Sequence, residues 1–377
     1  MWISNVRIVL ADAILQTGAL RIEEGQIAEL RDGPGKDAQL EGEGLLLTPG
    51  LIDMHGDMIE HALEPRVGVD IPLELTWRNL DRLLKVSGVT TAYASFSFHP
   101  RVADGQLQRY EQSKAAIKAL QTLRAQLAVD HKVHARFELG FPRAYEIVSE
   151  LVSAGLVELV SLMDHTEGQE QARDIERLTQ SGKDAGKPRT ETTDVLETME
   201  KLVSVCRNAD VCLASHDDDT AAKVATMKRF GVQICEFPET LEAAQAGRDT
   251  GQWTVMGAPN VMRGKSHSGN LSGRDAHAAG LLDMLASDYL PSAILPAVLI
   301  LAQTDPDRLP GALRKATLTP AQALGLADRG EIAIGKRADL ILASDSGVGG
   351  VYATFVEGRL VYRDGSPGAR AFGQATA

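Results

Sequence analysis

The chain has 377 residues, of which 44% are apolar and 24% are charged, and its formal net charge is −12. This length and composition are typical of a soluble globular protein, and they predict one barrel-sized domain with a smaller one beside it. The acidic balance argues against nonspecific binding to nucleic acid or to an anionic membrane. It still permits an anionic substrate, because a metal ion or a local cluster of Arg and Lys outweighs the global field.

Targeting signals are not expected. The first residues, MWISNVRIVLADAIL, lack the basic region, apolar run and cleavage site of a signal peptide. The longest apolar stretch, residues 290–302, contains two prolines and is too short to span a bilayer. The three cysteines form no Cys-x-x-Cys pair, which fits a reducing compartment. We therefore expect a cytoplasmic protein without membrane contact.

Predicted strands and helices alternate through most of the chain. β-like segments at residues 2–10 and 19–30 come first, followed by GLLLTPGLI at 44–52. Strand-like runs then alternate with helix-period segments to about residue 327, and β-like runs return at 331–343 and 351–362. The clearest inner strand runs are TTAYASF (90–96), ARFEL (135–139), LVSLM (159–163), VCLAS (211–215) and VQICEF (232–237), with helical spacing at 110–128 and 190–206. Repeated βα units predict a parallel sheet, and the two ends predict one small β-domain built from both.

Potential metal ligands stand where the first predicted inner strand ends. In TPGLIDMHGD, His55 and Asp57 are two residues apart. Residues at this spacing on a strand point to the same face, so both side chains can hold one ion. Taken alone, the pair also fits an ordinary solvated loop.

The same pattern recurs at later strand ends. Glu138 lies in ARFEL, His165 and His216 follow two further apolar runs, and Asp288 closes MLASD. Carboxylates and imidazoles at the ends of barrel strands face the functional side, and a metal ion is an efficient partner for them when buried. The recurrence makes a chance arrangement improbable, and Asp217 and Asp218 beside His216 are expected to fix the tautomer of its imidazole.

These motifs resemble the amidohydrolase superfamily. The resemblance implies a (β/α)₈ TIM barrel over residues 49–329, with a small β-sandwich domain from residues 1–48 and 330–377. In that family the first-strand pair binds one metal, a fourth-strand carboxylate bridges two, fifth- and sixth-strand histidines bind the second, and an eighth-strand Asp contacts metal and transfers protons. Carried over, these roles fall on His55 and Asp57, on Glu138, on His165 and His216, and on Asp288. Two divalent ions are implied, zinc first, with manganese or iron as alternatives.

Loop strings narrow the resemblance. HGDMIEH, PRVGVD, MDHTEGQ, SHDD, GAPNVMRGKSHSGN and DMLASDY look like the PhnM family of phosphonate-metabolism hydrolases, over nearly the whole chain. Members release pyrophosphate from α-D-ribose 1-methylphosphonate 5-triphosphate in the carbon–phosphorus lyase pathway. The resemblance therefore implies a small phosphorylated sugar as substrate. It leaves the oligomeric state open, with a homo-oligomer among the options.

Residues 263–270, RGKSHSGN, form the best candidate for phosphate recognition. A guanidinium, an ammonium, an imidazole, hydroxyls and glycine amides occur there within eight residues. Residues 166–193 are polar and are expected to form a long loop, which is a candidate lid. The expected substrate contacts are His61, Arg66, Arg263, Lys265, His267, Ser268 and Asn270, whereas His99, His131, His134 and His277 are interpreted as structural.

Two other functions fit the same scaffold. One is the hydrolysis of a cyclic amide or the deamination of a heterocycle, because a metal site alone does not separate these reactions from phosphoryl chemistry. The other is a metal-free scaffold protein that has kept the fold. The donor-rich segment 263–270 favours phosphoryl chemistry.

Overall fold

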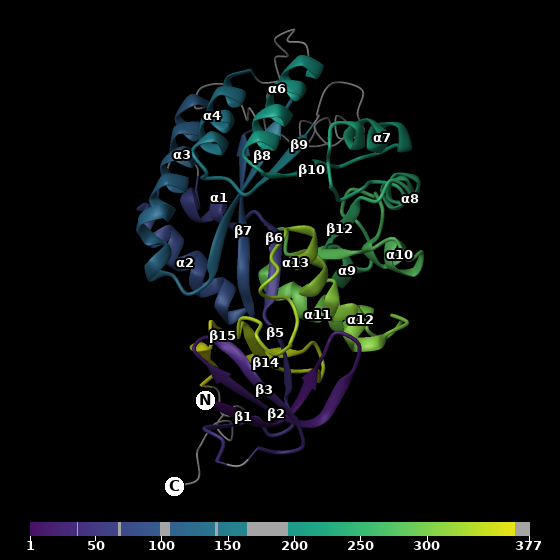
Figure 1. Cartoon of the computed structure of the whole chain (residues 1–377). Coiled ribbons are helices and arrows are strands. Elements are labelled where there is room, and N and C mark those ends of the chain that lie inside the picture. Colours follow the sequence, from purple (N-terminus) through teal and green to yellow (C-terminus); the bar gives the residue numbers. More distant parts are fainter. Residues whose placement is uncertain (36, 67–68, 99–105, 140–141, 164–194, 366–377) are drawn as a thin grey trace.

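The computed structural model of the chain describes residues 1–35, 37–66, 69–98, 106–139, 142–163 and 195–365. Two sheets of eight strands each organise these residues. One is a mostly antiparallel sheet built from both ends of the chain, and the other is a parallel sheet surrounded by helices (Figure 1). The predicted barrel with a small β unit made from both ends is confirmed.

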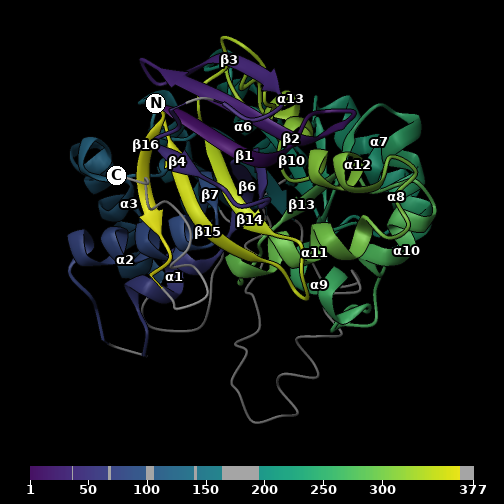
Figure 2. The same cartoon turned by 90° about the horizontal axis from the view of Figure 1, so that it is seen from below.

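The smaller sheet joins the two ends of the chain through one antiparallel pair. Its order is β16-β15-β14-β5-β1-β2-β3, with β4 beside β1, and β5 pairs with β14. A buried apolar cluster that includes Ile3, Leu20, Leu342 and Phe355 packs on it. Figure 2 shows the sheet from below. Its strands are β1 (Trp2–Val9), β2 (Ile14–Glu23), β3 (Gln26–Asp32), β4 (Leu40–Glu41), β5 (Leu46–Pro49), β14 (Leu340–Ser344), β15 (Gly350–Val356) and β16 (Arg359–Arg363).

The run at residues 44–52 divides into two strands that belong to different sheets. β5 ends at Pro49, and the first barrel strand, β6, begins at Leu51. Gly50 lies between them, and a Cβ there would stand 2.2 Å from Oγ1 of Thr90. Only glycine fits this close approach, so the Pro-Gly pair marks where the chain enters the barrel.

The barrel strands follow one another in chain order, each parallel to the last. The sheet closes at the carboxyl ends of its two edge strands: the backbone N–H of Asp288 donates to the carbonyl of His55 at 3.0 Å, and the N–H of Asp57 donates to the carbonyl of Asp288 at 2.7 Å. The strands are β6 (Leu51–Gly56), β7 (Val89–Phe98), β8 (Asp130–Glu138), β9 (Leu159–Met163), β10 (Cys212–His216), β11 (Ile234–Glu236), β12 (Trp253–Gly257) and β13 (Met284–Ala286).

Helices cover the outside of the barrel (Figure 1). The predicted helix at 110–128 is α3, which ends at Leu123 and continues into a 3-10 turn (Arg124–Gln126). Among the described residues no helix is both long and apolar enough to cross a membrane. The helices are α1 (Met58–Leu63), α2 (Leu73–Val86), α3 (Gln106–Leu123), α4 (Pro142–Ser153), α6 (Val195–Asn208), α7 (Ala221–Arg229), α8 (Leu241–Asp249), α9 (Ala258–Arg263), α10 (Gly273–Ala278), α11 (Ile294–Leu301), α12 (Arg308–Arg314) and α13 (Leu318–Ala323), with a second 3-10 turn at Pro291–Ala293.

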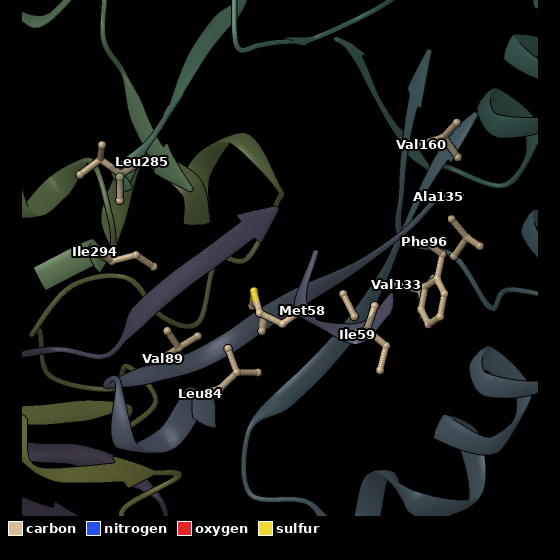
Figure 3. Packing of buried hydrophobic residues seen from close by; sticks show 14 of the residues in the cluster. Met58, Ile59, Leu84, Val89, Phe96, Val133, Ala135, Val160, Leu285 and Ile294 are labelled. Carbon is tan, nitrogen blue, oxygen red and sulfur yellow. The ribbon is translucent and has the colours of Figure 1, made fainter. Parts of the chain in front are cut away.

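The third barrel strand, β8, shows how side chains alternate across the barrel wall. Val133, Ala135 and Phe137 belong to the large apolar cluster between strands and helices, and Figure 3 shows Val133 and Ala135 near Phe96 of β7. Because successive side chains of a strand point to opposite faces, His134, Arg136 and Glu138 share the other face, towards the barrel interior. The strand therefore carries polar residues inward and apolar residues outward.

Asp81 of α2 fixes the start of this strand. Its carboxylate accepts hydrogen bonds from the backbone N–H groups of Ala128 and Val129, at 2.8 and 2.9 Å, and contacts Nε2 of His131 at 3.2 Å. Burial raises the pKa of Asp81, but the hydrogen bonds from His131 and Val129, with Lys85 nearby, outweigh it and lower the pKa to about 2. The ionised carboxylate is thus part of what holds β8 in register.

Replacing Asp81 should therefore give a pH-dependent loss of stability. A depressed folded-state pKa stabilises the protein above the unfolded value near 4, and this contribution is lost as the pH falls towards 2. We expect Asp81→Asn to lower the free energy of unfolding by about 1–2 kcal/mol at pH 7 and by progressively less as the pH falls from about 5 to 3. Urea unfolding followed by circular dichroism measures this, with the exposed Asp249→Asn as control. A wild type–variant difference that stays constant over that range would contradict the assignment.

Candidate metal centre

The first barrel strand places two potential ligands at the carboxyl end of the barrel. His55 is 1% exposed, and its Nε2 lies 3.4 Å from Oδ1 of Asp57. The two residues lie close together, as their spacing predicts. Asp57 also has its backbone tied to Asp288, so the first and last strand ends converge here.

Three buried side chains form the densest group of ligand atoms among the described residues. His55, His134 and Glu236 each offer one ligand atom, and these atoms all lie within 4.8 Å of one another. Oε1 of Glu236 lies 3.4 Å from Nδ1 of His55 and 3.8 Å from Nε2 of His134. Two buried imidazoles and a buried carboxylate are a donor set suited to zinc and other transition metals.

His216, at the end of β10, adds a third imidazole nitrogen, with a free lone pair. Its Nδ1 pairs with Oδ2 of Asp217, and its buried Nε2 has no hydrogen-bond partner. The ring lies 5.4 Å from that of His55, and Phe237 contacts both rings edge-on. A carboxylate on Nδ1 fixes the tautomer that leaves Nε2 unprotonated, which is how metal-binding histidines are commonly oriented. The residues present therefore fit a metal ion, and the expected role of Asp217 agrees with this contact.

Burial and opposite charges set the protonation of the cluster. Burial alone would lower the pKa of His55, but the carboxylates of Glu236 and Asp57 outweigh it and raise this pKa to about 10. Burial lowers the pKa of His134 to about 3, despite the attraction of Glu236. Glu236 is buried too, yet the nearby imidazoles lower its pKa to about 2. The two carboxylates thus favour a positive charge at His55, and a metal ion bound there would supply that charge in place of the imidazole proton.

Two serines contact the His134 imidazole, and one of them, Ser161, links it to Glu236. The hydroxyl of Ser161 donates to Oε2 of Glu236 at 2.5 Å and contacts Nε2 of His134 at 2.5 Å. The Ser95 hydroxyl lies 3.0 Å from Nδ1 of the same imidazole. If His134 is neutral and carries its proton on Nε2, every donor and acceptor in this hydrogen-bonded series has a partner. In this state His134 holds Glu236 in place through Ser161, and it can offer Nε2 to a metal ion only in the other tautomer, with the proton on Nδ1.

Arg136 lies two residues beyond His134 on β8, on the same face of the strand. Its Nη1 donates to Oδ1 of Asp57 at 2.6 Å, and its side chain is 15% exposed. Burial acts to raise the pKa of Asp57, but Arg136 and His55 together keep this pKa well below its usual range. A guanidinium therefore borders the cluster on the side of the first-strand carboxylate.

Asp53 joins the first barrel strand to the segment after the last. Its carboxylate accepts from the backbone N–H of Ser287 at 2.9 Å and from the Ser287 hydroxyl at 2.5 Å. Burial raises the pKa of Asp53 to about 6, although these hydrogen bonds favour its charged form. The next residue, Asp288, has a positive φ of 56°, which a non-glycine residue adopts at a cost. Asp217 (55°) and Phe237 (51°) share this feature, so three strand ends around the cluster are backbone turns held under strain.

The structure corrects the strand positions that the resemblance implied. Glu138 ends the third barrel strand rather than the fourth, and His216 ends the fifth rather than the sixth, because the parallel pairings fix the order β6 to β13. His165 comes after Met163, the last residue of the fourth strand, and lies outside the described residues. Glu236 occupies the sixth strand end. Glu138 is buried on the same strand face as His134, and its role as a ligand stays a proposal.

The predicted substrate contacts lie on the same side of the barrel, in loops after strands. Arg263, the last residue of α9, is exposed, as are Lys265 and His267 after it. Ser268 and Asn270 are half-buried there, and the segment is tied to the turn after β11 by the hydrogen bond from the Leu271 N–H to the Glu239 carbonyl. His61 in α1 and Arg66 after it are exposed as well. The candidate lid at 166–193 lies outside the described residues, and the substrate roles stay proposals.

Sequence reasoning missed three residues of the site. Glu236 closes VQICEF and follows the strand-end pattern that identified the others, so the signal was present. His134 and Arg136 precede a strand end, and a polar residue in mid-strand gives no indication of which face the closed barrel turns inward. His134 was interpreted as structural, whereas the structure places it within the cluster.

An eight-stranded parallel barrel with imidazoles and carboxylates at its carboxyl end is typical of metal-dependent barrel enzymes. Comparison with known proteins agrees: residues 87–361 match the amidohydrolase family. The chain also shares 38% identity over 361 residues with the alpha-D-ribose 1-methylphosphonate 5-triphosphate diphosphatase of Escherichia coli (strain K12), covering 91% of this chain and 95% of that one. The chain belongs to the amidohydrolase family.

Solved structures share the fold at low sequence identity. The N-acetylglucosamine-6-phosphate deacetylase of Thermotoga maritima superposes with a TM-score of 0.61 at 18% identity, covering 97% of this chain and all of the other (100%). A D-hydantoinase from a Bacillus species gives a TM-score of 0.63 at 14% identity, with 96% and 95% of the two chains covered. These likenesses establish the architecture of the barrel and the small sheet.

Removing the Glu236 carboxylate should weaken the binding of metal at the centre. Glu236→Gln keeps the shape of the side chain but withdraws the charge shared by His55 and His134, so we expect at least a tenfold loss of metal affinity, in the range seen when ligand-shell groups are removed. Metal content after purification without chelators, measured by inductively coupled plasma mass spectrometry, tests this. Glu158→Gln, which removes a carboxylate at the opposite end of β9, is the control. Equal metal content in the two variants would exclude Glu236 as a ligand.

Proposed function

We propose that the protein is a metal-dependent hydrolase that releases pyrophosphate from α-D-ribose 1-methylphosphonate 5-triphosphate. The observation that carries the proposal is the similarity of nearly the whole chain to the E. coli diphosphatase of that name. The buried cluster of His55, His134 and Glu236 supports it, because hydrolysis of a triphosphate requires electrophilic help at the phosphoryl group.

The proposed centre holds divalent metal, zinc first, on His55, Asp57, Glu138, His165, His216 and Asp288, with Glu236 and His134 added by the structure. Bound metal would lower the pKa of water and offset the charge that builds on phosphoryl oxygens. The chain itself orients these ligands: Asp217 fixes the His216 imidazole, and Ser161 fixes Glu236.

The proposed reaction transfers the α-phosphoryl group to water. The water oxygen bonds to the α-phosphorus, the bond to the bridging oxygen of the β-phosphate breaks, and pyrophosphate leaves with that oxygen. Asp288 accepts the proton of the attacking water, and the sugar keeps a 5-phosphate. Asp288 is suited to this role because its backbone is fixed between His55 and Asp57.

Product analysis tests the proposal directly. Metal-loaded protein incubated with α-D-ribose 1-methylphosphonate 5-triphosphate should give pyrophosphate and the 5-phosphate as the phosphorus products, followed by phosphorus NMR. Ammonia or ring opening from cyclic amides or aminated heterocycles, without turnover of the triphosphate, would favour the first alternative. Protein purified with less than about 0.2 metal ions per chain, and inactive after metal is added, would favour a scaffold.

Asp288→Asn separates proton transfer from metal binding. The amide keeps the shape and the backbone hydrogen bonds of Asp288 but does not accept the proton, so we expect kcat to fall by roughly 10²-fold or more. Metal content and melting temperature should stay near wild-type values. Undiminished turnover would remove Asp288 from the mechanism, and loss of the metal would make it primarily a ligand.

A further inference from the structure

We propose that Arg136 binds the phosphate chain of the substrate inside the barrel. This inference rests on the proposed function and names the cation that selects an anionic substrate there. Its starting point is the composition of the barrel wall. The eight barrel strands contain two side chains with permanent positive charge, Lys132 and Arg136, and both belong to β8.

Only one of these two cations faces the metal centre. Lys132 lies near the start of β8, where its Nζ is 3.6 Å from Oδ2 of Asp130. Arg136 lies four residues further along the same face, next to Asp57 at the carboxyl end. An anion that reaches the cluster from the carboxyl end of the strands therefore comes close to Arg136, whose position is fixed by its strand.

Arg136 has more N–H hydrogen-bond donors than it uses among the described residues. A guanidinium carries five N–H donors, and the structure shows one hydrogen bond from this side chain, from Nη1 to Asp57. Its buried Nε has no partner. Leaving a buried donor unsatisfied costs free energy, and an anion with oxygens spaced for two parallel hydrogen bonds would relieve that cost. Phosphate is such an anion, and the Arg136 side chain is 15% exposed.

The surrounding charges make this cation necessary for a polyphosphate. Asp57, Glu236 and Asp288 converge near the cluster, and their negative charge repels a triphosphate. Metal ions offset part of this repulsion, and Arg136 offsets more of it at a fixed position. A neutral cyclic amide needs no such cation. The exposed Arg263 ends α9 and the exposed Lys265 follows it, so neither cation belongs to the barrel wall.

The competing explanation is that Arg136 merely neutralises Asp57. In that case its loss would disturb the first-strand ligand, lower metal content and reduce turnover of every substrate alike. As a phosphate anchor, its loss would leave metal content unchanged and weaken the binding of anions. The two explanations therefore differ in readouts that do not depend on turnover.

The test compares Arg136→Met, Arg136→Lys and the control Arg124→Met in metal-loaded protein. Arg124 also pairs with a carboxylate, Glu158 at 2.9 Å, but before β8 and far along the strand from the centre. Binding of tripolyphosphate and pyrophosphate is measured by calorimetry, metal by mass spectrometry, and KM and kcat with the ribose triphosphate. We expect Arg136→Met to weaken tripolyphosphate binding by roughly 10- to 100-fold and to raise KM, with metal content unchanged. Arg136→Lys should fall between, because an ammonium keeps the charge but loses the fork.

Three outcomes overturn the role of Arg136 as a phosphate anchor. Wild-type anion affinity in Arg136→Met, metal loss like that of Glu236→Gln, or an equal loss of affinity in Arg124→Met would do so. If Arg136→Met does not fold, Arg136→Lys with wild-type anion affinity and KM decides against it. Arginine-dependent tripolyphosphate binding without pyrophosphate release from the sugar triphosphate would refute the proposed function while leaving the anchor in place.

Discussion

The hydrogen bonds between Asp53 and Ser287 are the constraint on which the centre depends, because they join the first barrel strand to the segment after the last. Across this seam the backbones of His55, Asp57 and Asp288 bond to one another, so residues more than two hundred positions apart in sequence meet at one point. A parallel barrel brings all its strand ends to one face. The hydrogen bonds between Asp53 and Ser287 set how closely the ends of the first and last strands approach each other.

Charge balance is the second constraint. The buried His55 and Glu236 and the partly exposed Asp57 are held in charged forms, and each is stable there only because an opposite charge lies close by. His134 is the exception, since it stays neutral and satisfies both ring nitrogens with serine hydroxyls. The cluster thus combines charged groups, at which a bound metal would displace a proton, with a neutral His134 that keeps the geometry fixed.

The sequence predicted the βα order and most strand ends, because apolar runs followed by His, Asp or Glu are a local pattern. His55, Asp57 and Asp288 were found this way, and the backbones of all three meet in the barrel. The pattern failed inside β8, where the inward face depends on closure of the whole barrel rather than on neighbours in sequence. The pattern also does not number the strands. Glu138 and His216 were therefore expected on the fourth and sixth strands, whereas they end the third and the fifth. The segment 263–270 stood out by composition, which does not reveal that most of its cations are exposed.

Specificity on this scaffold follows from where a cation is fixed. The same architecture is shared with a deacetylase and a hydantoinase at under 20% identity, so the fold does not select the substrate. A cation on a loop samples many positions, whereas one on a strand is held by the sheet on both sides and by its own neighbours. Arg136 is held in this way: around it β8 pairs with β7 on one side and β9 on the other, and Asp81 ties the beginning of β8 to α2. The restraints that set the register of β8 therefore also set the position of the guanidinium beside Asp57, and through it the kind of anion the centre can accept.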